Sequence, residues 1–436
     1  MSFISIQELY KKYQTCSEVA TDTRKITPNS MFFALKGPNF DANTFAAEAL
    51  IKGASFSVVD NPEFVTQPNI LLVEDTLLAL QQLAIFHRKN LAIPFIGLTG
   101  SNGKTTTKEL INRVLSKKYK TYATIGNLNN HIGVPLTVLA IDSSVEVAII
   151  EMGANKQGDI KELADICEPT HGFITNIGKA HLEGFGGIEG VKKGKGELYD
   201  FLAKNKGIIF ANTDSEATLG MLNERTGFKE IHFFSPSPAE NVYFSSHLLQ
   251  DNPIVVFEDE TGTTYQSHLT GKYNFDNMCA AMAIGKYFGI NAQDASEAVA
   301  SYNPTNNRSQ LVQKGSNWVL MDAYNANPSS MNAAITYFEN LKAEKKLVIL
   351  GDMFELGEDA AQEHKILGEL LAKCHFDIIL LAGELMQNAL IHLPNAYYFP
   401  DKFGLHLWLQ DHPQTHTHIL VKGSRGMGLE SVLQFL

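Results

Sequence analysis

The chain has 436 residues and a formal net charge of −11, from 36 Lys and Arg against 47 Asp and Glu. At about 150 residues per domain, this length indicates about three domains, and a hydrophobic content of 44% is enough for several cores. The acidic balance argues against a general role in nucleic-acid binding, which usually requires a basic surface for the phosphates. No apolar run approaches the ~20 residues of a membrane-spanning helix.

The start of the chain and its cysteines favour a cytoplasmic protein. The first residues, MSFISIQELYKKYQ, lack the basic start and apolar core of a signal peptide. The four cysteines are scattered and form no CxxC pair, which is typical of a reducing compartment and argues against a disulfide framework or a zinc site. We therefore expect a cytoplasmic protein without stable membrane insertion.

Residues 1–86 mix short apolar runs with turn residues. The runs SMFFALKG, SFSVVD and NILLVED predict strands, and FAAEALIKGA predicts a helix. This pattern indicates a small N-terminal α/β domain.

Residues 87–305 alternate apolar strands, turns and helices. The predicted buried strands are IPFIGL, VEVAIIEMG, GFITNIG and GIIFAN. This alternation predicts a parallel sheet with helices on both faces. The stretch from about Glu240 to His268 differs, because NVYFSSHLL, PIVVFED and TTYQSHL predict a meander of antiparallel strands. GKYNFDNMCAAMAIGKYFG then returns to helix.

The polar stretch SYNPTNNR marks the next boundary. Beyond it, WVLMDAY, KLVILGDM, FDIILLAG and THILVKGS predict four strands with helices between them. This is the pattern of a second doubly wound α/β unit, which we place at residues 306–436.

The strongest local signal is a glycine-containing loop between a predicted strand and a predicted helix. In such loops backbone N–H groups point at phosphate oxygens, and the following helix directs its positive end at the same anion. Lys104 adds a charge for the β- and γ-phosphates, and Thr105 adds a hydroxyl for Mg²⁺. The spacing differs from the usual P-loop, because Leu98 stands where that loop has its first glycine. The predicted ATP loop comprises Thr99, Gly100, Ser101, Asn102, Gly103, Lys104, Thr105 and Thr106.

This variant loop, T-G-x-N-G-K-T, resembles the ATP loop of the Mur ligase superfamily, which includes folylpolyglutamate synthases. Further segments match in order along essentially the whole chain, namely IIEMGANKQGDI, TNIGKAHLEGFG, VKKGKGELY, GKYNFDNMCAA, NNRSQ and MDAYNANPSS. Within the superfamily, EMGAN, YNANPSS and VKGSRGM resemble the branch that acts on D-alanyl-D-alanine. The DNPR motif of the tripeptide ligase sibling does not occur.

The resemblance implies a fold and a reaction. The fold is α/β with three domains: a small N-terminal domain for the UDP end of the substrate, a central P-loop ATPase-like parallel sheet and a C-terminal Rossmann-like domain. In the reaction, ATP phosphorylates the terminal carboxylate of UDP-N-acetylmuramoyl-tripeptide. The amino group of D-alanyl-D-alanine attacks the acyl phosphate, and the UDP-muramoyl-pentapeptide precursor of peptidoglycan is formed. We expect a monomer.

The implied catalytic residues are Lys104, Glu151, His181 and Lys195. Because ATP and a carboxylate are both anions, positive charge and metal must offset their repulsion. Thr105 and Glu151 offer oxygen ligands for one Mg²⁺, and the resemblance places a second Mg²⁺ near His181. It also implies that CO₂ carbamylates Lys195, which turns this cation into an anion. Taken alone, Glu151 is more typical of a helix cap, His181 of a loop histidine and Lys195 of a solvated helix lysine.

Four further residues are implied in ATP binding. Asn274 and Asn277 lie one helical turn apart, so that both can face the same site. Arg308 is expected on a phosphate and Asp322 on the ribose, when the domains close. The family usually has His before the first asparagine, and this chain has Tyr273, so we assign no role to that position.

Residues for the other two substrates come from the outer domains. Thr23 and Arg24 are implied in binding uracil or the diphosphate, although the family's usual D-G-H is here Asp41-Ala42-Asn43. An Asn- and Ser-rich turn after the strand WVLMDAY is implied in placing D-alanyl-D-alanine, and is also typical of helix capping. The residues of this turn that we assign to the dipeptide are Tyr324, Asn325, Asn327 and Ser330.

Two alternatives stay open at this point. A sibling ligase, such as a folylpolyglutamate synthase or another Mur ligase, shares the chemistry but not the YNANP segment. A P-loop kinase or nucleotide switch shares only the loop. The sequence does not specify whether the third residue of the tripeptide is meso-diaminopimelate or L-lysine.

Overall fold

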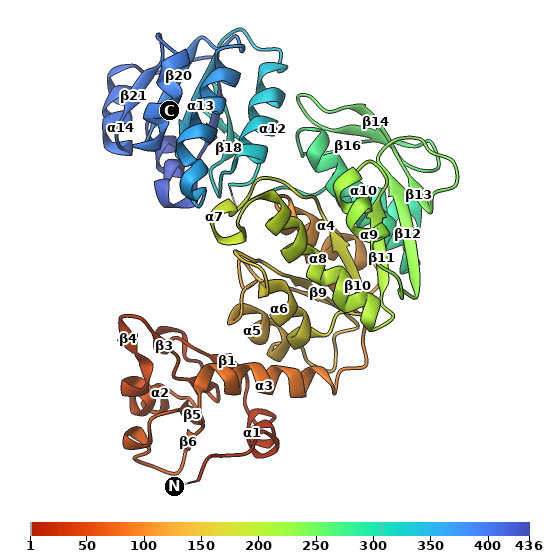
Figure 1. Cartoon of the computed structure of the whole chain (residues 1–436), viewed down its shortest axis with the longest axis vertical. Coiled ribbons are helices and arrows are strands. Elements are labelled where there is room, and N and C mark those ends of the chain that lie inside the picture. Colours follow the sequence, from red (N-terminus) through yellow and green to blue (C-terminus); the bar gives the residue numbers. More distant parts are fainter. Residues whose placement is uncertain (1, 306) are drawn as a thin grey trace.

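The computed structural model describes residues 2–305 and 307–436, and its strands form three main sheets that follow one another along the chain (Figure 1). The N-terminal sheet lies at one end of the molecule, the C-terminal sheet at the other, and the central sheet between them. Residue 306, the predicted start of the C-terminal domain, lies outside the described residues. The bounds 1–86, 87–305 and 306–436 therefore stay a prediction.

The N-terminal sheet is parallel and has the strand order β1-β2-β5-β6. Its strands are β1 (Val19–Ala20), β2 (Met31–Phe33), β5 (Phe56–Val59) and β6 (Ile70–Leu72), and a small hairpin joins β3 (Lys36–Gly37) to β4 (Phe40–Asp41). The helices are α1 (Ile6–Tyr13), α2 (Ala46–Ile51) and α3 (Thr76–Arg88). The three predicted strands and the predicted helix are confirmed as β2, β5, β6 and α2.

Helix α3 carries the chain to the central sheet. Arg88, in its last turn, is buried, and its guanidinium lies 3.8 Å from the centre of the Phe95 ring on strand β7 (Phe95–Thr99). The same group donates hydrogen bonds to the carbonyl oxygens of Cys167 (2.7 Å), Glu168 (2.8 Å) and Leu91 (2.9 Å). These contacts attach the helix to the central domain.

The central sheet is wholly parallel, with the order β13-β12-β11-β10-β7-β9-β8. Its other strands are β8 (Thr121–Ala123), β9 (Val147–Glu151), β10 (His171–Ile174), β11 (Ile208–Asn212), β12 (Glu230–Ser235) and β13 (Phe244–Ser245). Its helices are α4 (Lys104–Leu115), α5 (Gly133–Leu139), α6 (Asp159–Cys167), α7 (Leu182–Phe185), α8 (Ile188–Lys204), α9 (Glu216–Asn223), α10 (Lys272–Tyr287) and α11 (Ala292–Ala300).

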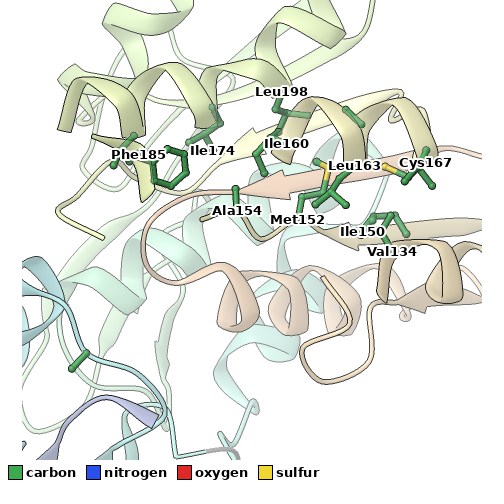
Figure 2. Packing of buried hydrophobic residues seen from close by; sticks show 14 of the residues in the cluster. Val134, Ile150, Met152, Ala154, Ile160, Leu163, Cys167, Ile174, Phe185 and Leu198 are labelled. Atoms are coloured by element: carbon green, nitrogen blue, oxygen red, sulfur yellow. The ribbon is translucent and has the colours of Figure 1, made fainter. Parts of the chain in front are cut away.

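Helices cover both faces of this sheet, as the sequence predicts. Every residue of β7, β9 and β11 is buried, which explains their unbroken apolar runs. On one face, side chains of α5, α6 and α8 such as Val134, Ile160 and Leu198 form one apolar cluster with side chains of the sheet (Figure 2). On the other face, α4, α10 and α11 supply a second cluster.

The predicted antiparallel meander is only partly correct. Strands β14 (His247–Gln250), β15 (Val256–Glu258) and β16 (Thr264–Gln266) do form an antiparallel sheet. The start of the segment instead forms β13, parallel to β12, because Phe244 is buried in the central core beside Phe234. The pairing of this short segment is decided by tertiary contact and not by local pattern.

The C-terminal sheet has the order β17-β18-β22-β19-β20-β21, with β17 antiparallel to β18 and all other pairs parallel. Its strands are β17 (Gln310–Lys314), β18 (Asn317–Asp322), β19 (Lys346–Gly351), β20 (Ile378–Ala382), β21 (Tyr397–Phe399) and β22 (His418–Lys422). Its helices are α12 (Pro328–Glu339), α13 (Ala360–Leu371) and α14 (Lys402–Asp411). The four predicted strands are confirmed as β18, β19, β20 and β22. No helix among the described residues is long and apolar enough to cross a membrane.

Candidate active site

A cleft of about 680 Å³ lies between the central and C-terminal domains. Its walls come from the loop before α4, the segments 127–131 and 176–181, helix α10, and the residues that follow β18 and end β22. Most predicted site residues line it together: Ser101, Asn102, Gly103, Lys104, Thr106, Glu151, His181, Asn274, Asn277, Arg308, Asp322, Tyr324, Asn325, Asn327 and Ser330.

Two glycines of the predicted ATP loop are required by its shape. Gly100 has φ +145°, and a Cβ there would lie 1.9 Å from the hydroxyl oxygen of Thr175. Gly103 has φ +78°, and a Cβ there would lie 2.8 Å from Oδ1 of Asn277. Any other residue at either position would be strained and would also clash, so the loop is closely packed on its neighbours.

The segment after β10 holds this loop through hydrogen bonds. The backbone N–H of Ser101 donates to the carbonyl of Asn176, and that of Asn102 donates to its side-chain Oδ1, both at 3.0 Å. The Ser101 hydroxyl donates to the carbonyl of Gly178 at 3.0 Å. Since these two N–H groups are occupied, the donors left for an anion are those of the first turn of α4, which have no intrahelical partner. The sequence pattern did not reveal Asn176.

Lys104 begins α4 and reaches back over the loop. Its ammonium donates to the carbonyl oxygens of Gly100 (2.6 Å) and Ser101 (3.2 Å). Burial lowers its pKa to about 8, while the carboxylate of Glu151 opposes this shift and the charge of Arg308 adds to it. A bound phosphate would supply the negative charge that this lysine lacks.

Glu151 ends β9 beside the loop and is 1% exposed. Its Oε1 accepts hydrogen bonds from the Thr105 hydroxyl (3.2 Å) and from Nδ2 of Asn129 (2.8 Å). Its Oε2 is buried and has no partner among the described residues. A buried carboxylate oxygen without a donor fits a cation, so Thr105 and Glu151 suit Mg²⁺. Asn129 is a further site residue that the sequence analysis missed, and the polar run GNLNNH is the one sequence feature that could have indicated it.

The polar partner of His181 is neither Thr105 nor Glu151 but a residue of the C-terminal domain. His181 adopts φ +53°, and its Nδ1 is 2.6 Å from Oε2 of Glu355, which belongs to the C-terminal domain. This close contact with His181 lowers the pKa of Glu355. No group of three or more His, Cys, Asp and Glu residues in the described chain is placed to hold a metal ion. The predicted second Mg²⁺ near His181 stays a prediction.

Lys195 is buried inside helix α8, behind the cleft wall, and only 1% of it is exposed. Its Nζ donates to the carbonyl of Ala154 at 3.2 Å and lies 5.1 Å from the centre of the Phe185 ring. Figure 2 shows Ala154 and Phe185 in the apolar cluster to which α6 and α8 contribute. Burial, and then the charge of Lys104, lower the pKa of Lys195 well below its usual value. Lys195 is therefore not the solvated lysine that its sequence context alone suggests.

Helix α10 brings its two predicted asparagines to the loop. Asn277 contacts Gly103, and its Nδ2 donates to Oδ1 of Asn274 at 3.4 Å. Tyr273, which received no role from the sequence, also lines the cleft, and its hydroxyl is 2.9 Å from that of Ser309. Tyr273 therefore links α10 to the start of the C-terminal domain.

Asp322 ends β18 at the cleft. Its Oδ1 accepts a hydrogen bond from the backbone N–H of Ser309 at 3.0 Å, and its Oδ2 forms an ion pair with the buried Lys422 at 2.5 Å. Arg308 stacks on Tyr324, with its guanidinium 3.7 Å from the ring centre. The sequence analysis assigned no role to Lys422, because it lies at the end of the predicted strand THILVKGS and has no other distinguishing feature there.

Asn327 serves both as a helix cap and as a contact between domains. Its Oδ1 accepts from the backbone N–H of Ser330 at 2.9 Å, which caps α12. Its Nδ2 donates to Oδ1 of Asn102 at 2.7 Å, across the cleft. Asn325 makes only a local hydrogen bond here, in which its Oδ1 accepts from the backbone N–H of Ala326 at 2.9 Å. The YNANPSS turn thus lies directly against the ATP loop.

The two predicted residues of the N-terminal domain are not part of the cleft. Thr23 begins a short 3-10 turn, and Arg24 is paired with Asp22 at 2.7 Å with 86% of its side chain exposed. Asn43, in the segment that replaces the family's D-G-H, is buried and donates to Asp60 at 2.8 Å. The role of Thr23 and Arg24 in binding the UDP end of the substrate stays a prediction.

Two protein families match this chain. Residues 98–285 match the Mur ligase middle domain, and residues 307–425 match the Mur ligase glutamate ligase domain. Together with the fold and the cleft, these matches define the class of the protein as an ATP-dependent amide ligase.

Individual relatives narrow this class. A UDP-N-acetylmuramoyl-tripeptide–D-alanyl-D-alanine ligase of Bacillus subtilis (strain 168) is 35% identical over an alignment of 437 positions, gaps included, and 96% of this chain and 92% of the relative are covered. The crystal structure of MurF from Acinetobacter baumannii is 30% identical, with a TM-score of 0.84, and covers 100% of this chain and 98% of its own. MurF from Thermotoga maritima in complex with ADP is 26% identical, with a TM-score of 0.82 and 97% of both chains covered. The chain belongs to the Mur ligase family, in its group of UDP-N-acetylmuramoyl-tripeptide–D-alanyl-D-alanine ligases.

Replacing Lys104 with Ala should reduce ATP-dependent ligation by about 10²-fold or more, because a charge aimed at the phosphates is lost. The fold should be unaffected, since the ammonium contacts only loop carbonyls. Steady-state kinetics and urea unfolding would measure the two effects. Lys117→Ala, which removes an exposed lysine just beyond α4, is the matched control. Activity of Lys104→Ala within about tenfold of wild type would contradict the assignment.

Proposed function

We propose that the protein joins D-alanyl-D-alanine to UDP-N-acetylmuramoyl-tripeptide with ATP, and so forms the UDP-muramoyl-pentapeptide precursor of peptidoglycan in the cytoplasm. The observation that supports this most is the contact between Asn102 of the ATP loop and Asn327 of the YNANPSS turn. It lies where a phosphoryl donor on the central domain would meet an amine held by the C-terminal domain.

The first chemical step requires that two anions approach each other. Lys104 and the N–H groups of the first turn of α4 bind the β- and γ-phosphates, and Arg308 adds a second positive charge. Asp322 binds the ribose, and Asn274 and Asn277 lie beside the nucleotide. Thr105 and Glu151 would hold Mg²⁺, which supplies charge neutralisation at the phosphates. The γ-phosphoryl group moves to the carboxylate oxygen of the tripeptide, and ADP leaves.

The second step forms the amide. The amine of D-alanyl-D-alanine, placed by Tyr324, Asn325, Asn327 and Ser330, attacks the acyl carbon. The amine loses a proton, and phosphate leaves. His181 lines the cleft with its ring held by Glu355, and we assign it to the neighbourhood of the transferred phosphoryl group.

The N-terminal domain, residues 1–86, binds the UDP end through Thr23 and Arg24. Residues 87–305 bind ATP, and residues 306–436 close over both substrates. Lys195 carries a carbamate, because burial favours the neutral amine that reacts with CO₂.

A phosphate-release assay with each substrate omitted in turn would test the function. We expect phosphate release only when ATP, a UDP-muramoyl-tripeptide and D-alanyl-D-alanine are all present, with one pentapeptide formed for each phosphate. Tripeptides ending in meso-diaminopimelate and in L-lysine should be tested separately. Release that is independent of the amine would indicate a kinase or a nucleotide switch, and release with a folate and glutamate would indicate the sibling ligase.

Replacing Lys195 with Ala should severely impair ligation, and added formate or acetate should restore part of the activity by occupying the vacant anionic position. Lys192→Ala and Lys193→Ala are controls in the same helix, because both side chains lie outside the buried cluster. These two variants should be mildly affected and indifferent to added carboxylate. Near-normal activity of Lys195→Ala, or rescue of Lys193→Ala instead, would refute the carbamate at Lys195.

A further inference from the structure

Arg425 is a cation near the cleft that the functions assigned above leave unused. It comes directly after β22, within the VKGSRGM segment, and its side chain is exposed. Its guanidinium lies 5.0 Å from the centre of the Tyr324 ring, and its Nη1 donates to the Tyr324 hydroxyl at 3.1 Å. Among the described residues, no carboxylate lies within 4 Å of it.

The backbone that carries Arg425 is fixed by its neighbour, Ser424. Ser424 is buried, its N–H donates to the carbonyl of Asp352 at 3.0 Å, and its hydroxyl accepts from the N–H of Phe354 at 2.9 Å. Arg425 is therefore a positioned group on a rigid base, with its charge free to meet a ligand.

The cations that line the cleft already have partners or a place beside the nucleotide. Lys422 is paired with Asp322, and Lys104 holds the ATP loop. Arg308 also stacks on Tyr324, but its charge acts on Lys104, which places it within electrostatic reach of the phosphates. Arg425, in contrast, is not among the residues that line the cleft around Lys104. Two guanidinium groups beside one tyrosine ring, both without a carboxylate, suggest two separate anionic ligands.

The incoming dipeptide presents such an anion. Its amine reacts, but its terminal carboxylate takes no part in the chemistry and must still be bound and oriented. A guanidinium fork matches a carboxylate through two parallel hydrogen bonds. The Tyr324 hydroxyl, which accepts from Arg425, keeps its own proton for a third hydrogen bond.

We propose that Arg425, held by the Tyr324 hydroxyl, binds the terminal carboxylate of the D-dipeptide acceptor. This inference rests on the proposed function and extends it, since it names the residue that selects an acceptor with a free carboxylate. Arg425 takes no part in bond formation. It orients the acceptor so that the amine faces the acyl group.

A comparison of D-alanyl-D-alanine with D-alanyl-D-alaninamide isolates this contact, because the two differ only in the terminal group. Wild-type protein should prefer the carboxylate by roughly 10- to 100-fold in kcat/KM, as expected for hydrogen bonds to a charged group. Arg425→Gln should remove most of this preference by lowering kcat/KM for the carboxylate alone. The KM values for ATP and for UDP-muramoyl-tripeptide should not change. Arg425→Lys, which keeps the charge but not the fork, should be intermediate.

Arg113→Gln provides the matched control. Arg113 also lies over a tyrosine, 5.6 Å from the Tyr302 ring centre, and donates to a carbonyl, that of Ser301 at 3.2 Å, but Tyr302, unlike Tyr324, does not line the cleft. This variant should keep the wild-type preference. Tyr324→Phe, which removes the hydroxyl and keeps the ring, should reduce the preference by a smaller factor than Arg425→Gln.

An Arg425→Gln variant that still prefers the carboxylate as strongly as wild type would overturn the inference. So would an effect confined to the KM for ATP, which would make Arg425 a nucleotide ligand. Failure of the wild-type protein to ligate either dipeptide would refute the proposed function itself, and the inference with it. Urea unfolding should show equal stability for Arg425→Gln and wild type, because the side chain is exposed.

Discussion

The hydrogen bonds between the ATP loop and the segment Thr175–Gly178 are the interaction on which the rest of the site depends. They fix Ser101 and Asn102, and so aim the first turn of α4 into the cleft. The next residue, Lys179, contacts the C-terminal domain, because its N–H donates to the Ser329 hydroxyl at 3.0 Å and its ammonium pairs with Glu363 at 2.5 Å. The phosphate-binding element and the acceptor domain are therefore held by one short stretch of chain.

The charge distribution of the cleft explains how an acidic protein can bind anionic substrates. The whole chain carries a net charge of −11, but Lys104, Arg308 and Arg425 have no carboxylate within 4 Å among the described residues. Burial makes the unpaired charge of Lys104 costly, as its lowered pKa shows. Bound phosphates and carboxylates would relieve that cost, so the free site favours its ligands electrostatically. Glu151 complements this arrangement, since its unpartnered oxygen favours a cation beside the phosphates.

Local pattern was sufficient for much of the fold and for part of the site. The buried strands β7 and β9 form unbroken apolar runs, and the loop between β7 and α4 carries the glycines that its backbone angles require. Edge strands such as β17 and β21 are short or largely exposed, so their composition carried no signal. Asn129, Asn176 and Lys422 were missed because each acts on a residue distant in the sequence, and only the folded chain brings those pairs together. Lys195 shows the same limit, since its local context is that of a solvated helix lysine and only the family resemblance assigned it to the site.

The central claim is that the active cleft exists only when the C-terminal domain is held against the segment that supports the ATP loop. The pair between Lys179 and Glu363 tests this most directly, because Glu363 is 7% exposed and lies across the domain boundary. A charge-reversal cycle would measure kcat/KM for Lys179→Glu, Glu363→Lys and the double variant. Each single reversal should lower kcat/KM by roughly tenfold or more, and the double reversal should restore most of it. Single reversals with wild-type kcat/KM, or a double variant no better than the singles, would contradict the account.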